Sequence, residues 1–271
     1  MPKVKVNDIE MYYEVHGKGT PLLLIRGWGS SSQRWSPNFL KALSQQHKLI
    51  IFDNRGTGRT SKPDTKYSIE QMADDASTLL DQINIPKAHI VGFSMGGMIA
   101  QCFSINYPEK TDGLVIACSQ AGVDVAPGPP KVFEVVELMI SPPVGMSQRE
   151  LWKKAMSLYS TPEHLEKHGE SMLDAMLNSK TIPTPGYVMR RQLDAIHEFS
   201  SVNELHMIKA PTLVMHGEKD AWIPVENSKV MAEKIPTAKL MLLDKSGHAF
   251  LEQPVEMIET ILGFLSEVDA C

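Results

Sequence analysis

Ser94 stands between glycines in the segment HIVGFSMGGMIAQ, residues 89–101. Its pentapeptide GFSMG, residues 92–96, matches the pattern G-x-S-x-G, in which a sharp turn joins a buried strand to a helix. The turn requires small flanking residues, because larger side chains would collide where the backbone reverses. It also holds the serine oxygen near the positive end of the following helix. The segment therefore predicts a nucleophilic serine, with an ordinary turn serine as the alternative.

A serine hydroxyl attacks efficiently only when a base takes its proton and an acid orients that base. His248 follows the apolar run AKLMLLD, residues 238–244, and precedes a helix expected to begin near Pro254. Asp220 follows the apolar run before that one. Both residues would lie at the carboxyl edge of a parallel sheet, in the order Ser…Asp…His. We therefore predict that His248 is the base and that Asp220 orients it.

Two other acidic residues compete for the orienting role. Glu218 lies within the same loop as Asp220, and Asp124 closely follows the apolar run 112–119. Asp124 is the stronger rival, because it also falls just beyond the carboxyl end of an expected strand.

Nine histidines occur in the chain, and several of them have other expected roles. His216 is expected to support the turn that carries the acid, and His89 precedes a buried strand without an evident task. His164 and His168 have the i, i+4 spacing of metal ligands. Their segment HLEKH departs from H-E-x-x-H, which favours a solvated helix face and no metal.

Attack on a carbonyl also requires donors for the negative oxygen of the tetrahedral intermediate. The backbone N–H of Met95 is one candidate, because it belongs to the residue after the nucleophile. The second is the backbone N–H of Trp28, in the sequence RGWG at 26–29 that follows an apolar run. Loss of one such donor costs about 2.7–4 kcal/mol of transition-state stabilisation.

An alternation of short apolar runs and helical segments must position these residues. Helical periodicity is expected over residues 68–83 and 95–107. Apolar runs typical of strands occupy residues 4–16, 21–26, 48–53, 89–94, 112–119, 211–217 and 238–244. Because strands and helices alternate, the fold class is α/β, with a mostly parallel, doubly wound sheet.

The alternation stops between residues 123 and 205, which contain helical segments and no convincing strand. We expect this segment to be an inserted helical cap between two parts of the core, residues 1–122 and 206–271. The segment is rich in methionine, which packs flexibly against irregular apolar surfaces. Most of these methionines are expected to be plain cap core, with one or two facing a pocket. They are Met139, Met146, Met156, Met172, Met176 and Met189.

Composition excludes several classes of protein. The formal net charge is −5, and no cluster of lysine and arginine suggests a nucleic-acid partner. The N-terminus has no continuous apolar stretch of the kind found in signal peptides or membrane spans. Cys102 and Cys118 are expected to be buried thiols and Cys271 a free one, which indicates a cytoplasmic protein. No motif indicates a cofactor, and the oligomeric state stays open.

Five segments together make the chain resemble the α/β-hydrolase superfamily along nearly its whole length. They are RGWG (26–29), DNRGTGRTSKP (53–63), the serine turn (92–97), HGEKDAWIP (216–224) and SGHAFLEQP (246–254). GFSMGGMIAQ and DNRGTGRT are most similar to esterases and lactonases of the 3-oxoadipate enol-lactonase type. The resemblance implies Ser94, Asp220 and His248 as the triad, Trp28 and Met95 as oxyanion donors, and a cap.

Arg26 departs from the pattern of the relatives, which usually carry histidine at this position. Arginine is permanently charged and forked. It could bind a substrate carboxylate or simply hold the neighbouring loop.

In the segment 53–63, Gly56 and Gly58 weakly suggest a dinucleotide loop, but the third glycine of that motif is absent. A structural loop with Asp53 paired to Arg55 is expected instead.

The sequence thus favours a cofactor-free serine hydrolase that cleaves a small carboxylic ester or lactone. Hydrolysis of a carbon–carbon bond in a diketone is an alternative, because related folds use the same triad for it. A ligand receptor with vestigial turnover is a third. Dehalogenases and epoxide hydrolases are disfavoured, since those relatives carry aspartate where this chain has Ser94.

Overall fold

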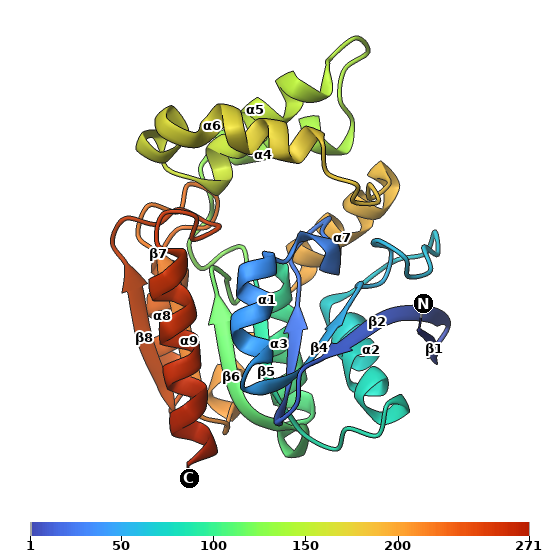
Figure 1. The fold of residues 1–271 in the computed structure, drawn as a ribbon, viewed down its shortest axis with the longest axis vertical. Helices are drawn as coiled ribbons and strands as arrows, with labels where there is room; N and C mark the ends of the chain where they lie inside the picture. The colour runs from blue at the N-terminus through green and yellow to red at the C-terminus, as the bar shows by residue number, and fades with distance from the viewer. Residues whose placement is uncertain (1, 271) are drawn as a thin grey trace.

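The computed structural model describes residues 2–270, which contain one sheet of eight strands (Figure 1). The strand order is β1-β2-β4-β3-β5-β6-β7-β8. β1 pairs antiparallel with β2, and β2 with β4, whereas all other neighbours are parallel. The strands are β1 (Lys3–Val6), β2 (Ile9–His16), β3 (Thr20–Ile25), β4 (His47–Phe52), β5 (Ala88–Phe93), β6 (Thr111–Ala117), β7 (Thr212–Gly217) and β8 (Ala238–Leu243). The predicted α/β class with a mostly parallel sheet is confirmed.

The single strand predicted over residues 4–16 is wrong. The chain forms a hairpin there, because Asn7 adopts a φ of 49° and reverses the backbone between β1 and β2. Asparagine tolerates the left-handed region better than most residues. The turn was missed because the alternation of apolar and polar residues continues on both sides of it.

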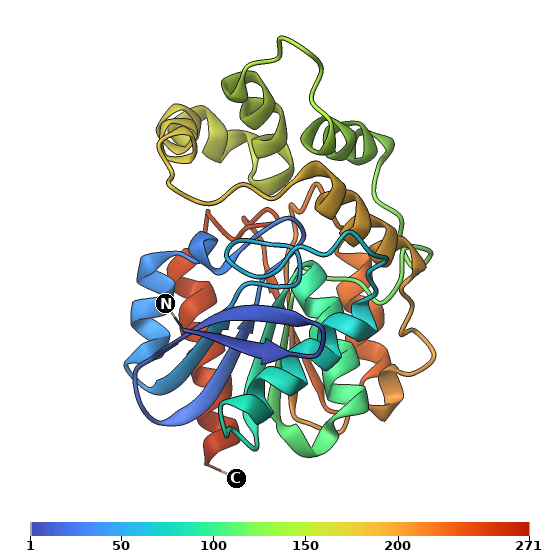
Figure 2. The same ribbon diagram turned by 90° about the vertical axis from the view of Figure 1, so that its right-hand side faces the viewer.

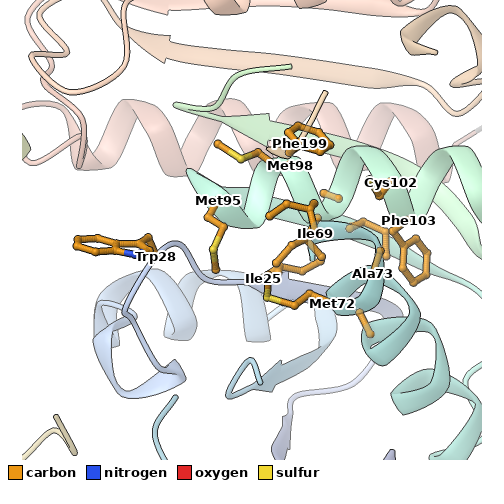
Figure 3. Packing of buried hydrophobic residues seen from close by; sticks show 14 of the residues in the cluster. Ile25, Trp28, Ile69, Met72, Ala73, Met95, Met98, Cys102, Phe103 and Phe199 are labelled. Carbon is orange, nitrogen blue, oxygen red and sulfur yellow. The ribbon is translucent and has the colours of Figure 1, made fainter. Parts of the chain in front are cut away.

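Helices cover both faces of the sheet, and alternate residues of β3 show the two layers. Leu23 and Ile25 belong to the core cluster that contains residues of α2 and α3, whereas Leu22 and Leu24 pack with residues of α1 and α9. Figure 3 shows Ile25 near Met72 of α2 in the first cluster. These helices and α8 have the bounds α1 (Pro37–Ser44), α2 (Ile69–Gln82), α3 (Met95–Asn106), α8 (Glu226–Lys234) and α9 (Pro254–Asp269).

The helices predicted over 68–83 and 95–107 agree with α2 and α3. Ser68 caps α2, since its hydroxyl accepts a hydrogen bond from the backbone N–H of Gln71 at 3.0 Å. The short helices α1 and α8 were not predicted. α1 has only eight residues, which are too few for the helical period to be recognised in the sequence.

Four helices occupy most of residues 123–205. They are α4 (Pro130–Ile140), α5 (Gln148–Tyr159), α6 (Pro162–Leu177) and α7 (Gly186–Glu198). Figures 1 and 2 show α4, α5 and α6 above the carboxyl ends of the strands, with α7 nearer the core. An isolated antiparallel bridge pairs Gly122, which directly precedes this segment, with Ser200 near its end. The bridge joins the two ends of the helical segment at one point.

The predicted pair of Asp53 and Arg55 is wrong. The Asp53 carboxylate accepts hydrogen bonds from the Arg59 side chain at 3.1 Å and from the Ser32 hydroxyl at 2.6 Å. The buried guanidinium of Arg55 points the other way, to the carboxylates of Asp8 at 2.7 Å and Asp75 at 2.9 Å. Asp53 and Arg55 therefore point to opposite sides of this loop, and Arg55 ties it to the turn between β1 and β2 and to α2.

Cys102 and Cys118 are buried free thiols, as predicted, whereas Cys271 lies outside the described residues. Among residues 2–270, no helix combines the length and the apolar character needed to cross a bilayer.

Two buried histidines meet at the start of β4 and β5. The rings of His47 and His89 lie edge to face with centroids 5.9 Å apart. Nε2 of His89 is 3.0 Å from Oδ1 of Asp269 on α9, but neither ring nitrogen of His47 has a hydrogen-bond partner among the described residues. Burial, together with the neighbouring His89, lowers the pKa of His47, and Asp269 and the Thr20 carbonyl oppose this only in part.

Acidification is therefore expected to destabilise the protein through His47. An unfolded histidine has a pKa near 6.5, so the unfolded state binds more protons than the folded state as the pH falls through about 6.5. Stability should be lost on that side. Urea unfolding at about pH 7.5 and about pH 5.5 measures the loss, which should be smaller for His47→Gln. The exposed His206, changed to glutamine, is the control; an equal loss in all three proteins would contradict the prediction.

Candidate active site

Ser94 lies at the turn between β5 and α3 in a strained backbone conformation, with φ 57° and ψ −124°. Close backbone packing explains the flanking glycines. A Cβ on Gly92 would lie 2.2 Å from the carbonyl oxygen of Gly96, and a Cβ on Gly96 would lie 2.2 Å from that of Ile25. Neither position accepts a side chain. The strain at Ser94 costs of the order of 1–3 kcal/mol and presents its oxygen at the carboxyl edge of the sheet.

The structure brings together the three residues predicted to act as a triad. Nε2 of His248 is 3.1 Å from Oγ of Ser94, and Nδ1 of the same ring is 2.7 Å from Oδ2 of Asp220. All three side chains are buried or nearly so. The imidazole therefore lies within hydrogen-bond reach of both the hydroxyl and the carboxylate, which is the geometry that proton transfer requires.

Both carboxylate oxygens of Asp220 have hydrogen-bond donors close to them. Its Oδ1 accepts the backbone N–H groups of Trp222 at 2.8 Å and Ile223 at 2.9 Å. Its Oδ2 lies 3.1 Å from Nε2 of His216 as well as close to His248. Burial alone would raise the pKa of Asp220, but His248 and His216 outweigh burial and hold that pKa well below its usual range. The carboxylate thus stays ionised beside the imidazole.

The rival acids lie elsewhere. Asp124 and Glu218 are exposed, and the carboxylate hydrogen-bonded to His248 is that of Asp220. His216 has the predicted supporting position, because its ring contacts the Ser228 hydroxyl at 2.6 Å and the Ile223 carbonyl at 2.9 Å. Its contact with Asp220 was not predicted.

The loop after β3 lies directly against the serine. A Cβ on Gly27 would fall 2.9 Å from Cβ of Ser94 and 3.4 Å from its Oγ. Trp28 is the next residue along this loop. The N–H of Met95, the first residue of α3, has no partner within its helix, as is general at helix starts. The two predicted oxyanion donors thus belong to segments that flank Ser94.

Residues of α7 fix this loop in place. The indole N–H of Trp28 donates to the Met189 carbonyl at 2.8 Å, and the Gly29 N–H donates to the Gln192 side chain at 2.8 Å. The loop conformation near Ser94 consequently depends on the segment 123–205 as well as on the core.

The loop that carries His248 is also fastened to this segment. The Glu252 carboxylate accepts the Ser160 hydroxyl at 2.7 Å, the Thr161 N–H at 2.8 Å and the Gly247 N–H at 3.0 Å. Burial would raise the pKa of Glu252, but these hydrogen bonds lower it overall. Glu252 therefore joins the junction between α5 and α6 to the histidine loop. No role was predicted for it from the sequence, although it lies in the segment SGHAFLEQP (246–254) that contributes to the family resemblance.

A cavity of about 690 Å³ lies between the helices of 123–205 and the carboxyl edge of the sheet. Its lining includes Trp28 and Ala249, the neighbours of Gly27 and His248, although Ser94, Asp220 and His248 themselves do not line it. The expectation that only one or two methionines face a pocket is wrong, since five of the six do so. The five are Met139, Met156, Met172, Met176 and Met189.

Arg26 lies on the wall of this cavity. Its guanidinium donates from Nε and Nη2 to the Ser30 hydroxyl, at 3.2 and 3.1 Å, and packs against the rings of Trp35 and Phe93, at 4.6 and 5.4 Å from the centroids. It has no ion pair with a carboxylate among the described residues. These contacts hold the neighbouring loop and leave the other N–H donors of the guanidinium without an acceptor among the described residues.

Two groups of described side chains have donor atoms close enough to hold a metal ion. One is His47, His89 and Asp269, and the other is Cys118 with Asp220 and His248. In the second group the carboxylate and the imidazole already pair with each other, and burial raises the pKa of the Cys118 thiol well above its usual value. A protonated thiol is a poor metal ligand, so this group fits a triad better than a metal centre.

The chain matches a family model described as the alpha/beta hydrolase fold over residues 20–254. It is 31% identical to RutD of Azorhizobium caulinodans, assigned to carbamate hydrolysis, over 99% of this chain and 100% of that protein. It is 32% identical to a poly(3-hydroxyalkanoate) depolymerase of Ectopseudomonas oleovorans, over 90% of this chain and 83% of that protein.

A solved structure of similar fold is the enol-lactonase from Burkholderia xenovorans. The TM-score is 0.82 at 23% identity, and the match covers 98% of this chain and 100% of that one.

Proposed function

The chain belongs to the α/β-hydrolase family of enzymes. From this membership and the geometry of the site, we propose that it cleaves a small carboxylic ester or lactone through an acyl-enzyme on Ser94. The observation that carries the proposal is the unbroken hydrogen-bonded path from Asp220 through His248 to the Ser94 hydroxyl. The names of the two relatives support a carbonyl substrate, since one refers to a carbamate and the other to a polyester.

In the first step, Oγ of Ser94 attacks the carbonyl carbon while its proton passes to Nε2 of His248. The backbone N–H groups of Trp28 and Met95 stabilise the oxygen that becomes negative. Asp220 holds the imidazole in the tautomer that accepts the proton and stabilises its positive form. The carbon–oxygen bond to the leaving group then breaks, and His248 returns the proton to the departing alkoxide.

In the second step, water attacks the acyl-enzyme. His248 removes a proton from that water, the serine ester bond breaks, and the proton returns to Oγ as the carboxylic acid leaves. Residues 123–205 would act as the cap, and its methionine-rich wall would take the apolar part of the substrate. The expected boundaries of the cap and of the two core segments, 1–122 and 206–271, are part of this proposal.

Stopped-flow hydrolysis of 4-nitrophenyl butyrate tests the proposed function. We expect a burst of nitrophenolate that matches the enzyme concentration, followed by sustained turnover, because nitrophenolate is a good leaving group and makes acylation faster than deacylation. A burst without turnover would support the receptor alternative. Faster hydrolysis of a ring-cleavage diketone than of any ester would favour carbon–carbon bond cleavage.

A further inference from the structure

The arginines of the described chain fall into two groups. Five form ion pairs with carboxylates, namely Arg55, Arg59, Arg149, Arg190 and Arg191. The other two, Arg26 and Arg34, pair with no carboxylate among the described residues, and both line the cavity beside the candidate active site. The unpaired arginines therefore coincide with the space in which a substrate would bind.

Arg26 is the deeper of the two. A guanidinium has five N–H donors, and the two hydrogen bonds of Arg26 both go to a single acceptor, the Ser30 hydroxyl. Its remaining donors have no acceptor among the described residues. Burial and the nearby charge of Arg34 lower the pKa of Arg26 to about 10, with Tyr159 opposing in part. It therefore stays charged at neutral pH without a neutralising partner.

Arg34 and Tyr159 lie on the same wall. The guanidinium of Arg34 packs against the ring of Trp152 at 5.3 Å, and burial lowers its pKa too. The Tyr159 hydroxyl makes no hydrogen bond with a described residue. Burial raises the pKa of Tyr159 to about 12, although both arginines oppose this, so the phenol remains a donor. Two cations and one hydroxyl donor thus share this wall.

No aspartate or glutamate lines the cavity. Two like charges in a partly buried space repel each other and lose hydration, which is unfavourable unless an anion joins them. Arginine is also the side chain that binds carboxylates with two parallel hydrogen bonds. The two uncompensated positive charges and the N–H donors that could bind a carboxylate therefore lie on the same cavity wall.

We propose that Arg26 and Arg34, with Tyr159, form a binding site for a carboxylate, so that the substrate carries a free carboxylate in addition to its scissile ester or lactone. This inference rests on the proposed function. It assigns Arg26 a substrate contact in addition to its hydrogen bonds with Ser30, and it adds Arg34 and Tyr159, for which no role was predicted. The apolar remainder of the substrate would lie along the methionine-rich wall.

A matched pair of substrates tests the proposal. Mono-4-nitrophenyl adipate has a free carboxylate, and the corresponding terminal carboxamide is neutral and of almost the same shape. We expect wild-type kcat/KM to be about tenfold to a hundredfold higher for the acid, because a charge-assisted hydrogen bond contributes about that factor. Arg26→Gln and Arg34→Gln should each remove most of the preference, measured within each variant as the ratio of kcat/KM for the acid to kcat/KM for the carboxamide.

Arg149→Gln is the matched control. Arg149 lies on α5, is exposed and pairs with Asp174, so this change removes one cap charge without reaching the cavity wall. It should leave the preference for the acid unchanged. Equal loss in all three variants would show that net charge, not this site, attracts the anion and would overturn the proposal.

Binding of adipate, measured by isothermal titration calorimetry, separates the two proposals. Adipate should bind to the wild-type protein and at least tenfold more weakly to Arg34→Gln, whereas adipamide should not bind detectably. Ester turnover without any preference for the acid and without adipate binding would overturn the carboxylate site and leave the proposed function intact. Adipate binding without any ester turnover would support the site and overturn the proposed function.

Discussion

Replacing Ser94 with alanine is expected to lower ester turnover about 10⁵- to 10⁶-fold, since removal of a triad nucleophile leaves only binding and oxyanion stabilisation. The fold should persist, because the change deletes one oxygen whose only hydrogen bond among the described residues is with His248. Steady-state kinetics and circular dichroism measure the two expectations. A fluorophosphonate probe adds a direct readout, as it should label the wild-type protein once per chain and leave the variant unlabelled.

Ser104→Ala is the matched control for this experiment. Ser104 is also a buried serine on α3, but its hydroxyl has no hydrogen-bond partner among the described residues. Labelling and turnover should both survive its loss. Labelling that persists in Ser94→Ala would mean that another residue is the nucleophile.

Asp220→Asn is expected to reduce kcat by about 10⁴-fold with little change in KM. Asparagine presents an amide N–H₂ toward Nδ1 of His248 and so favours the tautomer that cannot take the serine proton. It also deletes a negative charge that two histidines contact, at 2.7 Å and 3.1 Å. Stopped-flow kinetics at neutral pH provide the measurement.

Asp124→Asn should leave kcat within a factor of about two, because surface substitutions away from a site have little effect. Asp124 is exposed, and Asp220 holds the carboxylate position beside His248. The reverse pattern, with Asp124→Asn inactive and Asp220→Asn active, would move the orienting acid to the end of β6.

The sheet could be predicted because each parallel strand is a short apolar run, and the apolar runs near β4, β5 and β7 match the observed strands to within one residue at either end. Local chemistry was harder to predict. No glycine or proline marks the chain reversal at Asn7. The ion-pair partner of Arg55 depends on the direction in which its own side chain leaves a tight loop. Such choices depend on distant residues such as Asp8 and Asp75.

Topology explains why three distant residues could be predicted to meet. Parallel strands end at one edge of the sheet, so Ser94 after β5, Asp220 after β7 and His248 after β8 were expected there, and their side chains lie within hydrogen-bond distance. The cavity wall could not be predicted in this way. Arg34 and Tyr159 come from segments whose relative packing is set by side-chain shape, not by strand order.

The hydrogen bonds of Glu252 limit how the helices of residues 123–205 can move relative to the sheet. Its carboxylate accepts hydrogen bonds both from the α5–α6 junction and from the loop that carries His248. A second connection is the hydrogen bond from the Ala249 N–H to the Tyr159 carbonyl, at 3.0 Å. A movement of the α5–α6 junction away from the sheet would therefore either break these hydrogen bonds or displace the loop that carries His248. If the hydrogen bonds persisted, the proposed transfer of the serine proton to His248 would take place only while the helices rest on the sheet.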